Sequence, residues 1–281
     1  MVSINDAARA TRVTFRTVNP LIVKAQTYFV SMAQMALMAL IPQLVSAGSS
    51  SDWTYSGPVG PAHWAQLDPQ FSVCGSGAAQ SPINIEQPAN AAPSAKPLEF
   101  HYQPALLDIT NTGHAVQVNL QPESSSITLG DQRYSLLQFH FHIPAEERFH
   151  HHAAFMDAHF VHRSQDGKYL VVAVQFQIGT VRNAAIQEII DYAPHQKGAQ
   201  YKASDVQLDL LELLPANHAY DTYEGSLTTP PCTQGVTWIE LTTPVTITSG
   251  QLDAMGRFYK GNQRPVQPFN GRKVYQVTDE R

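Results

Sequence analysis

Residues 136–142 read LLQFHFH and carry the clearest structural pattern in this chain of 281 residues. Apolar and polar side chains alternate along it, and this pattern predicts a β-strand with one buried face. Phe139 and Phe141 then point into a core, while His140 and His142 point together to the other face. The strand is therefore expected to hold two imidazoles side by side.

A second strand with the same alternation follows at residues 156–162, which read MDAHFVH. A hairpin across residues 143–155 would place His159 beside His140 and His142. Three imidazoles on one face suit zinc, with a fourth position left open for water, whereas hard cations prefer oxygen ligands. We therefore interpret the three histidines as candidate zinc ligands.

The remaining histidines of this region are interpreted differently. His162 lies three residues after His159, so along a strand its side chain points to the opposite face. The run of residues 150–152 is all histidine and falls in the expected hairpin. We interpret this run as a solvated loop that could bind metal adventitiously.

The rest of the chain predicts further strands and few helices. Strands are expected at residues 115–120, 169–178 and 236–241, and a surface loop at residues 87–97. Helices are expected at residues 184–192 and 205–214, capped by Asn183 and Ser204 respectively, with Pro215 ending the second. Strands and helices do not alternate regularly, which argues against a parallel α/β sheet. The predicted fold is mainly β (α+β), a single domain on a large, mostly antiparallel twisted sheet with a few short peripheral helices.

The N-terminal region has the pattern of an export signal. Residues 28–45 contain no charged residue, basic residues precede them, and Val45-Ser46-Ala47 follows. This order predicts a secretory signal peptide over residues 1–47, leaving 48–281 as the exported domain, periplasmic or secreted. An uncleaved membrane anchor is the alternative, although the run is at the short end of the spanning range. After cleavage no stable membrane insertion is expected.

Charge and cysteine content narrow the possible partners. The net charge is −5, and residues 1–47 carry four basic residues against one acidic residue, so the remainder carries −8. An acidic body argues against nucleic-acid binding. Cys74 and Cys232 are the only cysteines and both follow the export segment. Export favours one disulfide between them, and two buried thiols are the alternative.

Several further sequence blocks occur in a family-specific order. They read GPAHW at 60–64, QSPINI at 80–85, NTGH at 111–114, YEGSLTTPP at 223–231 and NQRPVQ at 262–267. Together with the two histidine strands, they resemble the α-class carbonic anhydrases, in particular the exported bacterial members. The resemblance covers residues 53–267 and implies zinc-dependent, reversible hydration of carbon dioxide to bicarbonate and a proton, by attack of a zinc-activated hydroxide. A monomer or homodimer is expected.

The resemblance also implies catalytic roles outside the zinc ligands. Thr228 would orient the attacking hydroxide, and Glu146 would accept a hydrogen bond from Thr228. His114 would relay the proton to buffer, a role suited to a histidine near its ordinary pKa.

A substrate pocket follows from the same resemblance. Carbon dioxide is apolar, so an apolar wall beside the zinc needs no charged anchor. The residues expected to line this pocket are Val161, Val171, Leu227, Thr229 and Trp238.

Supporting residues are implied in the same way. Gln138, Asp157 and the carbonyl group of Asn262 would accept hydrogen bonds from the zinc histidines and so fix their tautomers. Cys74 and Cys232 match the positions of the family's disulfide pair.

The sequence departs from the family pattern near the zinc ligands. Asp157 stands where the family usually has glutamate, and residues 144–147 read PAEE where the family has P-S-E-H. Gln175 falls in a strand that is usually apolar. Two other functions remain open: a non-catalytic binding protein on the same fold, and an exported zinc-binding protein that uses the run 150–152.

Overall fold

The computed structural model describes residues 52–86, 88 and 98–279, all within one compact unit, Ser49–Arg281. The predicted signal peptide and nearly all of the predicted loop at 87–97 lie outside the described residues. Among the residues described, no helix combines the length and apolar character needed to cross a membrane.

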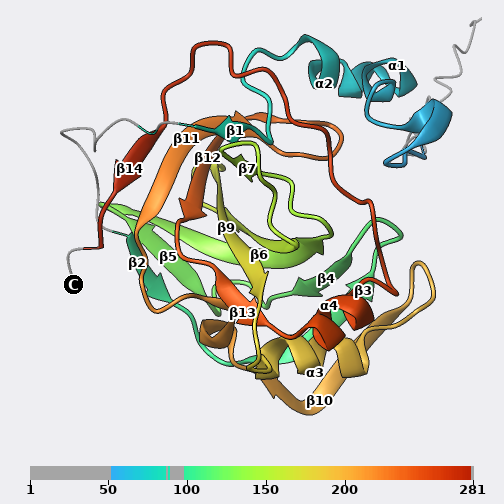
Figure 1. The fold of residues 1–281 in the computed structure, drawn as a ribbon, viewed down its shortest axis with the longest axis vertical. Helices are drawn as coiled ribbons and strands as arrows, with labels where there is room; N and C mark the ends of the chain where they lie inside the picture. Colours follow the sequence, from blue (N-terminus) through green and yellow to red (C-terminus); the bar gives the residue numbers. More distant parts are fainter. Residues whose placement is uncertain (1–51, 87, 89–97, 280–281) are drawn as a thin grey trace, which may run out of the picture. The chain divides into compact units, whose positions relative to one another are not determined.

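Strands dominate this part of the chain (Figure 1). They are β1 (Asn84–Ile85), β2 (Leu98–His101), β3 (Ala105–Asn111), β4 (Val116–Asn119), β5 (Ser126–Leu129), β6 (Gln132–His142), β7 (Arg148–Phe149), β8 (Met156–Arg163), β9 (Tyr169–Ile178), β10 (Gln200–Leu208), β11 (Tyr220–Ser226), β12 (Gln234–Leu241), β13 (Val245–Ile247) and β14 (Tyr275–Val277). The helices are short: η1 (Gly57–Val59), α1 (Trp64–Leu67), η2 (Pro69–Phe71), α2 (Val73–Ser76), α3 (Ala184–Tyr192), η3 (Leu210–Leu213) and α4 (Ser249–Met255).

One large sheet organises the described residues. Its main path runs β10-β3-β4-β6-β8-β9-β12-β11-β14, with β5 and β2 attached beside β6 and β13 beside β9. Only the pairs β9–β12 and β9–β13 are parallel in this sheet. The predicted fold class, a mostly antiparallel sheet with few short helices, is confirmed.

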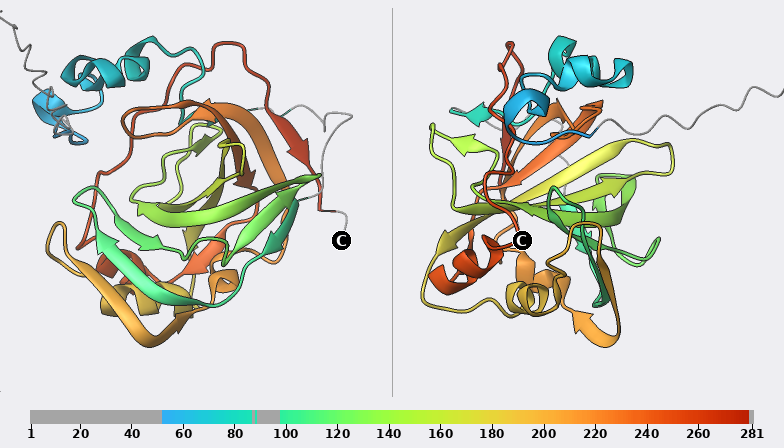
Figure 2. Two further views of the ribbon diagram at one scale, coloured as in Figure 1. Left: turned by 180° about the vertical axis from the view of Figure 1, so that it is seen from behind. Right: turned by 90° about the vertical axis from the view of Figure 1, so that its right-hand side faces the viewer.

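The helices lie at two opposite ends of the sheet. α3 and α4 pack together beside β10, whereas α1 and α2 lie at the other end, near β1 (Figures 1 and 2). Asn183 caps α3, because its side-chain oxygen accepts the Ile186 N–H, and this helix is confirmed from 184 to 192.

The predicted helix at residues 205–214 is wrong. Residues 200–208 form β10, which pairs antiparallel with β3, and only the turn η3 follows, capped by Asp209. Tertiary pairing with β3 overrides the local helical pattern here. Ser204 therefore lies within a strand and caps nothing.

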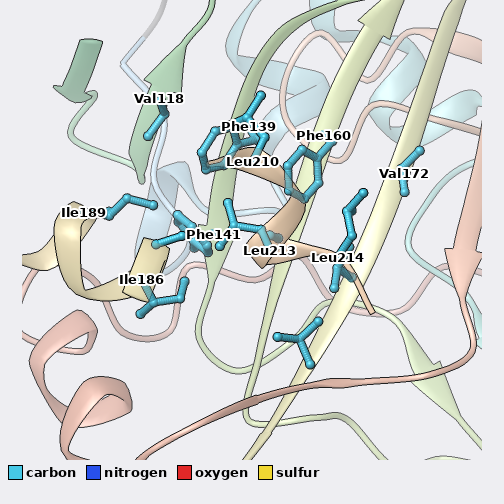
Figure 3. Packing of buried hydrophobic residues seen from close by; sticks show 14 of the residues in the cluster. Val118, Phe139, Phe141, Phe160, Val172, Ile186, Ile189, Leu210, Leu213 and Leu214 are labelled. Carbon is cyan, nitrogen blue, oxygen red and sulfur yellow. The ribbon is translucent and has the colours of Figure 1, made fainter. Parts of the chain in front are cut away.

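The main core lies on the face of the sheet to which the phenylalanines point. Figure 3 shows Phe139, Phe141 and Phe160 packed against side chains of α3 and η3. Phe139 and Phe160, on neighbouring strands, stack with ring centroids 4.9 Å apart. This packing fixes the alternation of β6 and β8 and so turns their histidines to the opposite face.

Candidate metal centre

The candidate site is built from three neighbouring rows of side chains on one face of the sheet. Directly paired residues in neighbouring strands project from the same face, and rows two residues apart share it. The first row runs Gln138, Val161, Val171, Trp238, Tyr223; the second runs His140, His159, Ala173, Glu240, Asp221; the third runs His142, Asp157, Gln175.

The three predicted zinc histidines converge. Each offers one ring nitrogen, and these nitrogens all lie within 4.8 Å of one another. The ring centroids of His142 and His159 are 4.6 Å apart, and those of His140 and His142 are 5.1 Å apart. The predicted hairpin, which lays His159 directly opposite His140, is confirmed.

Hydrogen bonds select which nitrogen of each ring is free. His140 Nδ1 donates to Gln138 Oε1 at 2.8 Å, and His142 Nδ1 donates to the Asn262 carbonyl oxygen at 2.7 Å. His159 instead uses Nε2, which lies 3.2 Å from Glu147 Oε2 and 3.4 Å from Asp157 Oδ2. These contacts leave Nε2 of His140, Nε2 of His142 and Nδ1 of His159 as the three ring nitrogens that can turn toward a metal ion.

The donor set fits a zinc ion. His142 is fully buried, and its Nε2 atom has no hydrogen-bond partner among the described residues. Leaving a buried polar atom unpaired costs about 1–3 kcal/mol, so this nitrogen requires a partner. Three nitrogen donors with an adjacent cavity match the usual three-ligand arrangement of catalytic zinc.

The protonation of the histidines follows from their surroundings. Burial, with His142 and His159 close by, holds the pKa of His140 well below its ordinary value, so this ring stays neutral. Burial also acts to lower the pKa of His159, but the Asp157 and Glu147 carboxylates overcome it and raise that pKa well above its ordinary value.

Asn262 links several parts of the site. Its carbonyl oxygen accepts from His142, and its side-chain oxygen accepts the Ile143 N–H at 3.0 Å. Its side-chain NH₂ donates to the carbonyl oxygens of Phe141, at 2.9 Å, and His114, at 3.1 Å. One residue therefore fixes the end of β6 and the segment that carries His114.

Glu146 is buried beside the histidines, but it accepts its hydrogen bond from a residue that was not predicted. Its Oε1 accepts the Arg264 N–H at 2.6 Å, while its Oε2 is buried with no hydrogen-bond partner in the described part of the chain. The predicted hydrogen bond from Thr228 is therefore not formed here. The free oxygen is the acceptor that such a bond needs.

The segment carrying Thr228 is anchored on both sides. Ser226 exchanges two hydrogen bonds with Ser81, at 2.9 and 3.1 Å, and its carbonyl oxygen accepts from Trp238 Nε1. A Cβ atom on Gly225 would lie 2.1 Å from Ser81 Oγ, so this close approach requires glycine. The predicted Cys74–Cys232 disulfide is present and fastens the far end of the segment.

A cavity of about 240 Å³ opens beside His140 and His159. Thr228 lines it, and its other walls include every residue predicted for the substrate pocket: Val161, Val171, Leu227, Thr229 and Trp238. The walls are largely apolar, so the cavity suits a small apolar molecule.

Two further cavity residues, Leu137 and Tyr169, were not predicted. Tyr169 lies two residues before Val171 on the same face, so the alternation of its strand could have identified it. Leu137 should share the face of Phe139, but the pairing of β6 with β8 shifts register between Leu136 and Gln138. This bulge turns Leu137 toward the cavity, and nothing in the sequence signals it.

His114 lies apart from the cavity lining just described. Its ring stacks on Trp53, with centroids 3.7 Å apart and planes 9° apart. Partial burial and the Lys197 ammonium lower the pKa of His114 from its ordinary value, against an opposing effect of Asp52. The indole of Trp53 was not anticipated as a support for this histidine.

The two remaining histidine predictions are confirmed. His162 is buried on the opposite face, where its Nε2 lies 2.8 Å from the hydroxyl oxygen of Tyr102. Residues 150–152 are exposed. In the described part of the chain, two groups of side chains lie close enough together to hold a metal, the three histidines and the set Glu147, Asp157 and His159, and neither includes residues 150–152.

A group of buried carboxylates lies behind His159: Asp157 was predicted there and Glu147 was noted as a departure from the family pattern, but Glu240 and Asp221 were missed. Glu147, Asp157 and Glu240 are each about 1% exposed, and Asp221 is 3% exposed. Burial, and then the nearby Glu147 carboxylate, raise the pKa of Glu240 well above its ordinary value; burial raises the pKa of Asp221 to about 6. Nothing in the local sequence around Glu240 indicated that it lies near His159, because strand β9 separates their two strands.

Comparison with known proteins agrees with the geometry. The family model of eukaryotic-type carbonic anhydrase matches residues 59–278. A carbonic anhydrase from Nostoc sp. is 39% identical over 230 residues, which are 80% of this chain and 86% of that protein. Dioscorin DB3L from Dioscorea polystachya is 30% identical over 233 residues, 80% of this chain and 85% of that protein.

Solved structures show the same similarity. The α-carbonic anhydrase from Thermovibrio ammonificans, in complex with the inhibitor sulfanilamide, superposes with a TM-score of 0.76 at 35% identity. The superposition covers 81% of this chain and 100% of that one. The residues that match the family model include the sheet and both histidine strands, and the chain belongs to the α-carbonic anhydrase family, lyases that interconvert carbon dioxide and bicarbonate.

Proposed function

We propose that this chain hydrates carbon dioxide with one zinc ion held by His140, His142 and His159. The observation that carries the proposal is the convergence of three ring nitrogens whose opposite nitrogens are all hydrogen-bonded. Zinc would supply Lewis-acid activation of water near neutral pH. The chain's other residues position the reactants around that centre.

The apolar wall would receive the substrate. Val161, Val171 and Trp238 form the first row of the sheet face, directly beside His159 in the second row. Carbon dioxide carries no charge, so contact with these side chains and exclusion of water suffice to hold it. Leu227 and Thr229 would close the pocket from the anchored segment.

Thr228 would orient the attacking oxygen nucleophile. Its side chain lines the cavity, and Glu146 has one buried oxygen free to accept the Thr228 hydroxyl proton. A threonine that donates to Glu146 can only accept from the nucleophile, which directs the nucleophile's lone pair toward the substrate.

His114 would carry the product proton away. It is partly exposed and stacked on Trp53, so it can exchange protons with buffer while its ring stays held against the indole. Because its pKa is lowered, its neutral form, which accepts a proton, predominates at neutral pH.

Export of the domain is part of the proposal. The residues before Gly48 have the order of a signal peptide, and a disulfide joins Cys74 to Cys232. Disulfides persist in oxidising compartments, which supports a periplasmic or secreted location. Mass spectrometry of unreduced protein from its native host should find a chain that begins near Gly48; an intact N-terminus with free thiols would contradict export.

Stopped-flow hydration of carbon dioxide tests the activity directly. The purified protein should carry about one zinc per chain and lose activity when a chelator removes it, and added zinc should restore both. Full activity in metal-free protein, or no activity in zinc-loaded protein, would refute the proposal.

A further inference from the structure

His159 faces two carboxylates where one acceptor would suffice. Its Nε2 atom lies 3.2 Å from Glu147 Oε2 and 3.4 Å from Asp157 Oδ2. We propose that Glu147 is the positioning residue for His159, and that glutamate at 147 and aspartate at 157 form one compensated exchange. The inference rests on the proposed binding of zinc by His159.

Asp157 is already engaged by the backbone. The Glu146 N–H donates to Asp157 Oδ2 at 2.7 Å, a shorter contact than the one from the same oxygen to His159. Asp157 lies directly opposite His142 in the β6–β8 pair, so its short side chain reaches the turn after β6 first. Its main role is to hold the backbone of Glu146.

Glu147 approaches His159 from a separate element. It immediately precedes β7, whose Arg148 N–H donates to the Ile83 carbonyl oxygen and whose residues pair with β1. The backbone is therefore fixed from outside the main sheet, and the Glu147 side chain is 1% exposed. Its longer side chain brings Oε2 to 3.2 Å from Nε2, whereas the Asp157 oxygen at 3.4 Å is shared with the Glu146 N–H.

Other contacts limit where the His159 ring can lie, but its rotation is set by the acceptor at Nε2. Trp238 packs edge-on against it, with centroids 5.0 Å apart and planes at 83°. Glu146 Oε2 is 4.0 Å from Nδ1, on the side where zinc would bind. The acceptor at Nε2 therefore decides whether Nδ1 points at the other two zinc histidines.

The two departures from the family pattern now have one explanation. Positions 147 and 157 are ten residues apart in the chain, and their side chains meet at the same nitrogen atom. Shortening the acid at 157 weakens one acceptor, and an acid at 147 supplies another.

A double-mutant cycle on zinc dissociation tests the exchange. The variants are Glu147→His, Asp157→Glu and the pair together, each loaded with one zinc and transferred into excess chelator. Glu147→His should release zinc about 10–100 times faster, Asp157→Glu should stay within about threefold of wild type, and the pair should recover to about threefold. Recovery by a second substitution distinguishes positioning from a general loss of packing.

Three outcomes would overturn the inference. They are an unchanged dissociation rate in Glu147→His, a double variant no slower than Glu147→His, and failure of the double variant to fold while Glu147→His folds. A zinc-loaded crystal structure of the wild-type chain supplies a check that needs no variant: Nε2 must lie closer to Glu147 than to Asp157. Wild-type protein that binds no zinc would refute the proposed function itself, before any variant is compared.

Discussion

Two adjoining rows of the same sheet face have opposite character. The first row presents Val161, Val171 and Trp238 to the cavity, whereas the second passes from His159 over Ala173 to Glu240 and Asp221. The strands and their registers are the same in both rows, so side-chain choice alone separates an apolar wall from an acidic one. The apolar row suits a neutral substrate, and the acidic row lies behind the residue proposed to hold a doubly charged ion.

Removing a proposed zinc ligand should have the largest effect on activity, because both rows of side chains lie around that metal centre. His142→Ala is expected to lose zinc and to bring carbon dioxide hydration down to the background rate, measured by metal analysis and stopped flow. Replacing His150, His151 and His152 together by alanine is the control, since these side chains are exposed. Metal loss in the control with retention in His142→Ala would contradict the ligand assignment.

Thr228→Ala should have the next largest effect on activity. It should alter the reaction in the cavity without altering the metal centre. It is expected to lower kcat and kcat/KM together by about 100-fold, because a misdirected nucleophile costs about that much. Zinc content should remain that of the wild type. A rise in KM with kcat unchanged would instead place Thr228 in substrate binding only.

His114→Ala should have a smaller, buffer-dependent effect. It is expected to lower kcat about tenfold in weak buffer and to leave kcat/KM nearly unchanged, because proton export follows the hydration step. A high concentration of imidazole should restore much of kcat. If kcat stays at the wild-type value in weak buffer, another group or a water chain carries the proton.

The smallest expected effect is on the free energy of unfolding, and it tests the acidic row. The pKa of Asp221 is raised to about 6, against 3.8 ordinarily, so between these values the folded state binds more protons than the unfolded state. The stability that Asp221 contributes is therefore fully present below about pH 4, and it is lost as the pH rises through about 6. Asp221→Asn should remove this loss, on the order of 1 kcal/mol after allowance for solvent screening.

Urea unfolding of wild type and variant between pH 4 and 7 measures the difference. Glu224→Gln is the matched control, because Glu224 is in the same strand and its side chain is exposed. The control should follow the wild-type profile at every pH. An Asp221→Asn profile parallel to wild type would show that this carboxylate titrates as it does in the unfolded chain.

The three histidines could be predicted from the residues themselves, because alternation with period two assigns a face to every residue of a strand. The apolar row and the role of Thr228 were implied only by the family resemblance of the sequence blocks, SLTTPP among them. The acidic row could not be predicted in this way. Glu240 lies in the same row as His159, close enough to feel its charge, only because β12 pairs parallel with β9, and strand order cannot be read from the local sequence pattern.

The errors have similar causes. The segment 200–208 became a strand because β3 was available to pair with it, and Leu137 reached the cavity through a bulge. Glu147 was noted as a departure from the family, but its partner nitrogen is on a different strand. Each case depends on a tertiary neighbour that no window of sequence contains.

The Cys74–Cys232 bridge has a consequence for the unfolded chain. Its half-cystines are 158 residues apart, and all three zinc histidines lie between them. The oxidised, denatured chain is then a covalent ring that confines the three imidazoles, and by the chain-entropy model this restriction lowers the entropy cost of folding by about 5 kcal/mol. The effective concentration of the imidazoles for one another is higher in that ring than in the reduced, linear chain. With the bridge intact, transient unfolding would therefore keep the three proposed zinc ligands tethered together, which would favour recapture of the metal on refolding.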